Sequence, residues 1–316
     1  MSKFDPYEHL NVTLNDDGSL TRYLNIPKLP ATTKEDQISP GQTVVSKDVT
    51  LNADNKTWMR IFRPTEPPSN HKKLPIILFL HAGGWIDLSV ANPFCHETCN
   101  KMAQGIPAIV IGLEFRLAPE HRLPAQYNDA VETINWVKKQ ALDPRGDQWL
   151  RDFADYSRFY LYGASCGANI AYNAVLRILE TKMEPLKIAG LIMNQPFIGG
   201  KKRTKSELKL ATDQYFPLPV IDLLWELALP AGTNRDHRFC NPLQECDKGK
   251  LKSIGRCLVI GFGGDPLIDR QQEFVKMLVM SGVRVEAKFD DVGFHNIDMI
   301  DQRRAAAILD FIKEFV

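Results

Sequence analysis

Residues 159–171 read F-Y-L-Y-G-A-S-C-G-A-N-I-A, and the order of patterns within them decides the fold class. Phe159–Tyr162 is strand-like and Ala168–Leu179 is helix-forming, with Gly163-Ala164-Ser165-Cys166-Gly167 between them. Glycines that flank a serine can be an ordinary turn with an incidental hydroxyl. A strand, G-x-S-x-G and a helix in this order instead indicate a sharp turn that exposes the serine above the helix N-terminus, where the dipole favours negative charge.

Strands and helices alternate along much of the chain. We expect strands at Thr43–Leu51, Trp58–Phe62, Leu74–Leu80, Ala108–Phe115, Arg158–Tyr162, Ile188–Asn194, Arg256–Gly261 and Val283–Asp290. We expect helices at 94–104, 124–140, 167–181, 269–282 and 301–315. Such alternation with short loops predicts one α/β domain over residues 1–316, with a mostly parallel central sheet and helices on both faces.

Two segments depart from this alternation. Residues 1–40 resemble an arm laid across a core, and residues 199–250 form a long excursion that contains the amphipathic piece Pro219–Leu229. Long excursions at the carboxyl edge of a sheet usually cover a site. We therefore expect a small helical cap built from about 1–40 and 199–250.

Charge and hydropathy exclude several classes of partner. The 316 residues include 39 basic and 38 acidic side chains, a formal net charge of +1, which gives no reason to expect nucleic acid or an anionic membrane as partner. The N-terminus shows no signal-peptide pattern, and no apolar run approaches eighteen residues. We expect a cytoplasmic protein, a monomer or homodimer, that binds a small molecule.

The six cysteines are irregularly spaced and predict reduced thiols rather than a disulfide framework. Cys95, His96 and Cys99 lie close together, but no second ligand pair follows at the spacing of a zinc site. The sequence therefore predicts neither a metal nor a cofactor.

A serine nucleophile needs a base, and the base needs an acid to orient it. Two histidines follow Ser165: His237 lies in the excursion, whereas His295 follows an expected strand and is the better base. Asp265, at the end of the strand C-L-V-I-G-F, is the candidate acid, while Asp269 and Asp298 remain rivals. Asp269 is better placed to cap the next helix.

Hydrolysis of an acyl bond also needs donors for the oxyanion. The loop His81-Ala82-Gly83-Gly84-Trp85 directly follows the apolar strand Leu74–Leu80, in the place of the H-G-G-G loop of lipases and esterases. We expect the backbone amides of Gly83, Gly84 and Cys166 to form the oxyanion hole. Because an elbow aims its central residue at the base, Ser165 rather than Cys166 is the expected nucleophile.

These motifs together resemble the plant carboxylesterases of the hormone-sensitive-lipase branch of the α/β-hydrolases. The segments that carry the resemblance are D-P-Y-E-H-L, D-G-S-L-T-R, L-P-I-I-L-F-L-H-A-G-G-W, E-F-R-L-A-P-E-H-R-L-P-A, G-A-S-C-G-A-N, W-E-L-A-L-P and G-D-P-L-I-D-R. They span essentially the whole chain. The resemblance implies a serine carboxylesterase acting on small, acetyl-like esters, such as those of plant alkaloids.

The chain departs from the family pattern at the oxyanion loop and at the elbow. The family usually has glycine where Ala82 stands, and its elbow usually reads G-D-S-A-G-G, so Ala164 replaces an acid and Cys166 a small residue. Ala82 and Trp85 are expected near a small acyl group. We expect Phe197, Tyr215, Phe216 and Ile297 to line an apolar substrate pocket, although core packing would explain each of them equally well.

Two other functions remain open on the same scaffold. Gibberellin receptors share the fold but lack the catalytic histidine, and His295 argues against a pure receptor. Some relatives use the triad for elimination or cyclisation, which the sequence leaves open.

Overall fold

The computed structural model describes residues 4–33, 43–66, 73–244 and 248–316. Parts of the expected arm (1–3 and 34–40) and of the excursion (245–247) lie outside the described residues. An eight-stranded sheet runs through the molecule in the order β10-β9-β8-β7-β5-β6-β4-β3. Its strands are β3 Val44–Asn52, β4 Thr57–Pro64, β5 Leu74–Leu80, β6 Ile109–Glu114, β7 Ala154–Ala164, β8 Ile188–Asn194, β9 Arg256–Phe262 and β10 Arg284–Asp290.

The strands from β6 to β10 pair in parallel, whereas β4 pairs antiparallel with both β3 and β6. β5 is buried at every residue. A strand covered on both faces must be apolar throughout, which is why L-P-I-I-L-F-L could be assigned from the sequence. The prediction of a mostly parallel α/β sheet is confirmed.

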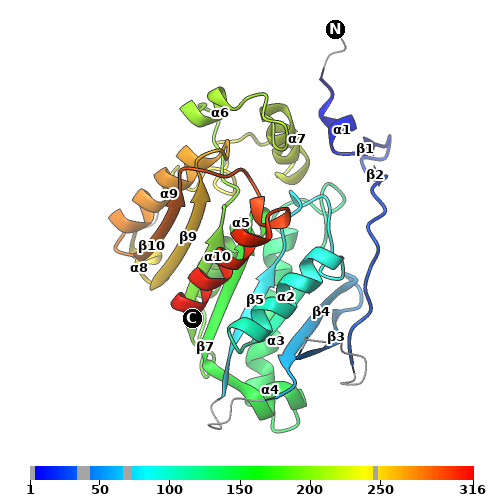
Figure 1. The fold of residues 1–316 in the computed structure, drawn as a ribbon, viewed down its shortest axis with the longest axis vertical. Coiled ribbons are helices and arrows are strands. Elements are labelled where there is room, and N and C mark those ends of the chain that lie inside the picture. The colour runs from blue at the N-terminus through cyan, green and yellow to red at the C-terminus, as the bar shows by residue number, and fades with distance from the viewer. Residues whose placement is uncertain (1–3, 34–42, 67–72, 245–247) are drawn as a thin grey trace.

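Helices cover both faces of this sheet (Figure 1). The larger helices are α2 Pro93–Gly105, α3 Ala125–Leu142, α5 Cys166–Ile178, α9 Ile268–Met280 and α10 Gln302–Phe315. Two apolar clusters divide the core: one receives side chains of α3, α5 and α9, and the other receives those of α2 and α10. Each expected helix is present within a few residues of its predicted bounds.

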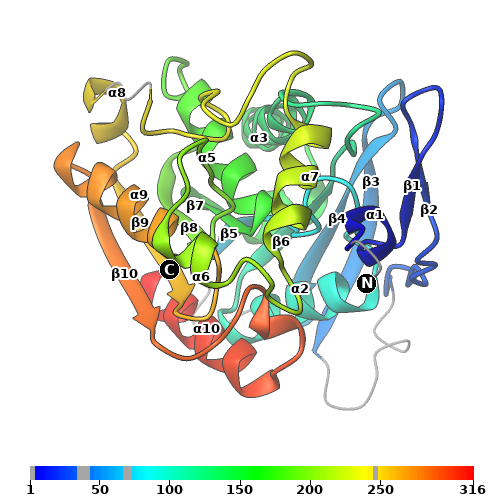
Figure 2. The same ribbon diagram turned by 90° about the horizontal axis from the view of Figure 1, so that it is seen from above.

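Short elements lie beyond the edge at which the parallel strands end (Figures 1 and 2). They are α1 Pro6–His9, the hairpin β1 Val12–Leu14 with β2 Leu20–Arg22, α6 Lys205–Lys209 and α7 Leu218–Ala228. The sequence predicted α7 but neither the hairpin nor α6. Three-residue strands and single-turn helices carry no periodicity, and tertiary contacts such as Leu20 N–H to Glu120 Oε1 (3.0 Å) hold them.

Three further short helices complete the described chain: α4 Gln148–Phe153, α8 Lys248–Lys252 and the 3₁₀ turn η2 Ile297–Met299. η2 begins two residues after His295, so the end of this loop is itself ordered into a turn.

Candidate active site

The turn between β7 and α5 holds Ser165 in a strained backbone conformation, with φ of 52° and ψ of −117°. A non-glycine residue rarely adopts such a φ, and its cost must be met by the surrounding structure. Here a Cβ at Gly163 would collide with the backbone of Gly167, and a Cβ at Gly167 with the carbonyl oxygen of Leu80. Glycine at both positions is therefore what lets strand, turn and helix approach closely enough to form the elbow.

Three side chains from distant segments form one continuous hydrogen-bonded chain. Ser165 Oγ lies 2.8 Å from His295 Nε2, and His295 Nδ1 lies 2.8 Å from Asp265 Oδ2. All three residues are buried. The arrangement suits an imidazole that donates from Nδ1 to the carboxylate and accepts at Nε2 from the serine hydroxyl, the geometry that general-base activation of a nucleophile requires.

The alternative acids, Asp269 and Asp298, and the alternative base, His237, contact other residues. Asp269 Oδ2 accepts from Ser206 N–H at 2.8 Å, within the first turn of α9 rather than at its N-cap. Asp298 Oδ2 accepts from Asn194 Nδ2 at 3.3 Å. His237 packs its ring against Phe239. Of the three carboxylates weighed, Asp265 is the one bonded to the His295 ring.

Two buried glutamines, which sequence reasoning missed, surround the acid and the base. Gln271 Nε2 donates to Asp265 Oδ2 at 2.8 Å. Gln195 Nε2 donates to the carbonyl oxygen of Phe294 at 2.9 Å and lies 3.4 Å from Asp265 Oδ2, while its Oε1 accepts from Asn296 N–H at 3.0 Å. Gln195 thus holds both neighbours of His295. It directly follows β8, and that position was its only signal in the sequence.

Two consecutive aromatic rings of the loop before α7 stack on two consecutive rings of the His295 loop. Phe216 lies parallel to the His295 imidazole, with centroids 4.3 Å apart, and Tyr215 stacks on Phe294 at 4.7 Å. Asp213 Oδ1 accepts from the backbone amides of Tyr215 and Phe216 and shapes this loop. Phe216 therefore covers the imidazole, whereas Tyr215 is half exposed and lies beside it.

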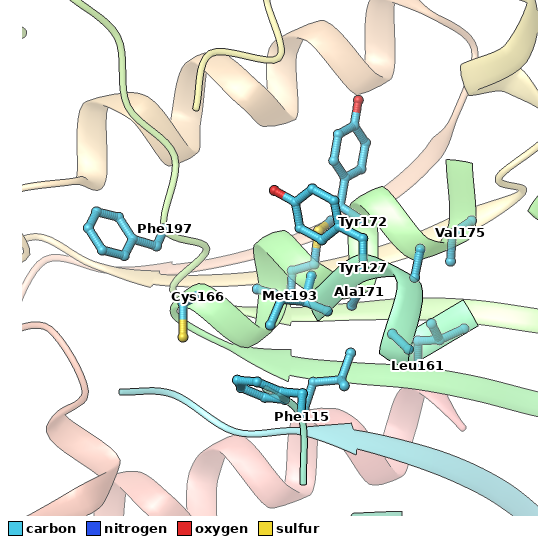
Figure 3. Packing of buried hydrophobic residues seen from close by; sticks show 14 of the residues in the cluster. Phe115, Tyr127, Leu161, Cys166, Ala171, Tyr172, Val175, Met193 and Phe197 are labelled. Atoms are coloured by element: carbon cyan, nitrogen blue, oxygen red, sulfur yellow. The ribbon is translucent and has the colours of Figure 1, made fainter. Parts of the chain in front are cut away.

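The predicted oxyanion loop follows β5 with left-handed backbone at Gly83 (φ 109°), Gly84 (φ 60°) and Trp85 (φ 66°). The Cys166 thiol packs against this loop: Trp85 N–H donates to its Sγ at 3.3 Å, and Sγ lies 3.7 Å from the carbonyl oxygen of His81. Figure 3 shows Cys166 at the start of α5, with its sulfur directed away from Phe197. The side chain thus bridges the two ends of the loop.

Burial raises the pKa of the Cys166 thiol to about 12, although nearby backbone amides act in the opposite direction. The thiol is therefore protonated at neutral pH and is a poor nucleophile. The raised pKa fits the prediction that Ser165, rather than Cys166, is the nucleophile of the elbow.

Aromatic rings pack over one side of the elbow. Trp85 stacks on Phe197 at 4.9 Å and lies 4.6 Å from Trp225, and Phe197 also contacts Phe216 edge-on. Trp225, from α7, is a member of this group that the sequence did not predict. Ala82 and Ile297, also expected in the pocket, belong to the opposite apolar cluster, the one formed with α2 and α10.

Comparison with known proteins shows the family of the chain. Residues 77–299 match the family described as the alpha/beta hydrolase fold. The chain is 50% identical to probable carboxylesterase 9 of Arabidopsis thaliana, over 99% of this chain and 97% of that relative. It is 44% identical to a 3-O-acetylpapaveroxine carboxylesterase of Papaver somniferum, over 99% of this chain and 97% of that relative.

Solved structures share the fold at lower identity. An arylesterase covers 93% of this chain, with 87% of its own length matched, at a TM-score of 0.72 and 19% identity. Within the described residues, no helix is long and apolar enough to cross a membrane.

Proposed function

The chain belongs to the plant carboxylesterases of the α/β-hydrolase fold, a family of carboxylic ester hydrolases, and from this premise we propose that it hydrolyses small, acetyl-like esters through Ser165, His295 and Asp265. The observation that carries the proposal is the unbroken hydrogen-bonded chain from the Ser165 hydroxyl through the His295 ring to the buried Asp265 carboxylate.

The proposed mechanism has two halves. Ser165 Oγ attacks the ester carbonyl while His295 Nε2 takes its proton, and Asp265 stabilises the imidazolium that forms. His295 then protonates the departing alcohol, leaving an acyl-enzyme. Water, deprotonated by His295, then attacks the acyl carbon, and the bond to Ser165 Oγ breaks as His295 returns the proton to that oxygen, which releases the carboxylic acid and the free enzyme. The amides of Gly83, Gly84 and Cys166 are proposed to hold the oxyanion in both halves.

We further propose that the N-terminal arm and residues 199–250 act as a cap, and that the alcohol part of the substrate packs among the aromatic rings. Trp85, Phe197 and Trp225 are fully buried against one another, so the rings that we propose for an apolar alcohol are Phe216 and the half-exposed Tyr215. A relative named for 3-O-acetylpapaveroxine supports an acetylated alkaloid as the natural substrate class. The five described cysteines are free and buried, which supports a cytosolic location.

Replacing Ser165 tests the proposal. The purified protein should hydrolyse p-nitrophenyl acetate, and Ser165→Ala should lower kcat by about 10⁴-fold or more, because removal of the nucleophile ends acyl-enzyme formation. Ser281→Ala, which removes another buried hydroxyl, is the matched control and should retain full activity. Full activity in Ser165→Ala would refute the assignment.

Covalent labelling separates an esterase from a receptor on the same scaffold. A fluorophosphonate should form an adduct that maps to Ser165 by mass spectrometry and is absent from the Ser165→Ala variant. An unlabelled wild-type protein that also turns over no simple ester would indicate a binding protein instead.

A further inference from the structure

A cavity lies between α2 and α10, apart from the aromatic rings over Ser165. Its volume is about 480 Å³. α2, β7, η2 and α10 provide its walls, and the two helices run side by side on one face of the sheet (Figures 1 and 2). The apolar part of the lining includes Phe94, Met102, Ile308, Leu309 and Ile312. Its size falls within the range of small-molecule sites.

The polar end of this cavity has unsatisfied hydrogen-bonding groups. Asp298 and Tyr162 line it, and Asn194 Nδ2 lies 3.3 Å from Asp298 Oδ2 and 3.4 Å from Tyr162 Oη. Asp298 Oδ1 and Asn194 Oδ1 are both buried without a hydrogen-bond partner among the described residues. Buried polar atoms are nearly always paired, so the orphaned Oδ1 of Asp298 in the cavity wall, and that of Asn194 on the residue in contact with it, call for a donor from outside the chain.

The charges around the cavity favour a cationic donor. Glu97 and Lys101 line it and pair with each other at 3.6 Å, which leaves Asp298 as the lining carboxylate that has no Lys or Arg ion pair among the described residues. Burial raises the pKa of Asp298, and its own backbone amide, the contact with Asn194 and the charge of His295 only partly offset this. An ammonium group next to the carboxylate would stabilise its charged form and satisfy the orphaned oxygens.

We propose that the cavity between α2 and α10 binds a small protonated amine with an apolar body, its ammonium donating to Asp298 and its apolar part lying against Phe94, Met102 and Leu309. The site is separate from the hydrolytic centre and does not depend on turnover. Asp298 stands three residues after His295, so a bound amine lies against the segment that carries the proposed base.

The methionines offer a direct test. Of the eight in the chain, Met102 and Met299 line the cavity, whereas Met59 and Met193 are buried elsewhere. In protein labelled with ¹³C-methyl methionine, 2-phenylethylamine should shift the Met102 and Met299 signals with a Kd of about 0.1–1 mM and leave Met59 and Met193 unchanged. The uncharged 2-phenylethanol should bind at least about tenfold more weakly.

Three variants locate the bound amine. Asp298→Asn keeps the side-chain shape and should weaken 2-phenylethylamine at least about tenfold. Ala306→Phe, at an exposed position of α10 on the cavity rim, should fill the cavity and abolish the shifts. Phe216→Ala, at the aromatic rings over His295, should leave the Kd unchanged.

Four results would overturn the proposal: no shift at millimolar amine, unaltered affinity in Asp298→Asn, equal affinity for the alcohol, or loss of binding in Phe216→Ala alone. The first would mean that water alone satisfies the orphaned oxygens. The last would place the amine at the hydrolytic site. All readouts are binding shifts, so they stand whether or not the protein hydrolyses esters.

Discussion

Gln195 is the residue that ties the proposed base to the proposed acid. Its side chain is fully buried, its backbone is left-handed at φ 47°, and its amide contacts the backbone on both sides of His295 as well as Asp265. A strained, buried polar residue persists only where its surroundings over-determine it. We regard Gln195 as a positioning residue, because it acts on the substrate through His295.

Replacing Gln195 should therefore affect kcat more than KM. Gln195→Ala frees the loop that carries His295, and a displacement of about 1 Å costs on the order of 100-fold in rate. We expect kcat for p-nitrophenyl acetate to fall by about 10–100-fold, with KM changed less than about threefold.

Gln126→Ala provides the control for Gln195→Ala. Gln126 is equally buried and bonds to the carbonyl oxygens of Arg116 and His121, away from the hydrolytic site. The Gln126→Ala variant should have a lower free energy of unfolding in urea but an unchanged kcat. A proportional loss of stability and activity in both variants would reduce Gln195 to a structural role.

The elbow is an element whose geometry depends on the absence of two Cβ atoms. Gly167→Ala places a methyl group against the carbonyl oxygens of Leu80 and His81, and neither backbone atom can move without disturbing β5 and the oxyanion loop. We expect a loss of about 3 kcal/mol or more in the free energy of unfolding. Urea titration followed by circular dichroism measures this loss.

Gly232→Ala is the matched control for the elbow. Unlike Gly167, Gly232 has a positive φ, 78°, and a Cβ there meets nothing within 4 Å. Its cost should be the backbone strain alone, about 1–2 kcal/mol. Equal losses at the two positions would show that close approach is not what requires glycine in the elbow.

The loop before α7 should govern how the proposed site receives aromatic esters. Phe216→Ala removes the ring that covers His295 and the edge contact with Phe197, contacts worth about 0.5–1.5 kcal/mol each. We expect kcat/KM for 1-naphthyl acetate to fall about 3–10-fold more than that for ethyl acetate. Leu208→Ala, at an exposed position of α6, should leave kcat/KM unchanged for both esters.

At the scale of the whole molecule, an ion pair fastens the N-terminal hairpin to the sheet domain. Arg22 donates to both carboxylate oxygens of Glu120, at 2.8 and 2.7 Å. Burial alone would raise the pKa of Glu120, but the hydrogen bonds from Arg22 and from Leu20 N–H outweigh it and lower the pKa to about 2. A depressed pKa in the folded state stabilises that state wherever the unfolded carboxylate is ionised.

The sign of the pH dependence follows. The contribution of Glu120 to the free energy of unfolding is fully present above its ordinary pKa of 4.5. It is lost as pH falls towards about 2. Glu120→Gln should therefore be less stable than wild type near pH 6, and the difference should shrink below about pH 4.5. Urea unfolding across this range measures it, and a difference that grows in acid would contradict the assignment. Glu97→Gln, at the exposed pair with Lys101, should show little difference at any pH.

The sequence alone determined the parallel sheet, the elbow and the order of the proposed serine, acid and base. These depend on side-chain periodicity and on backbone sterics within a few residues, as in Leu74–Leu80 or between Gly163 and Gly167. Such local patterns can be recognised in the sequence because they depend only on residues that are close together in the chain.

Only the tertiary structure decided which carboxylate reaches His295, that Gln195 holds the loop, and that Phe216 covers the ring. Residues 195, 216, 265 and 295 meet because β8 lies beside β9 in the sheet and the loop before α7 folds back over their ends. It also turned the Cys166 thiol towards the proposed oxyanion loop. Such contacts join segments far apart in the chain, so their geometry follows from strand order and packing, which no local pattern records.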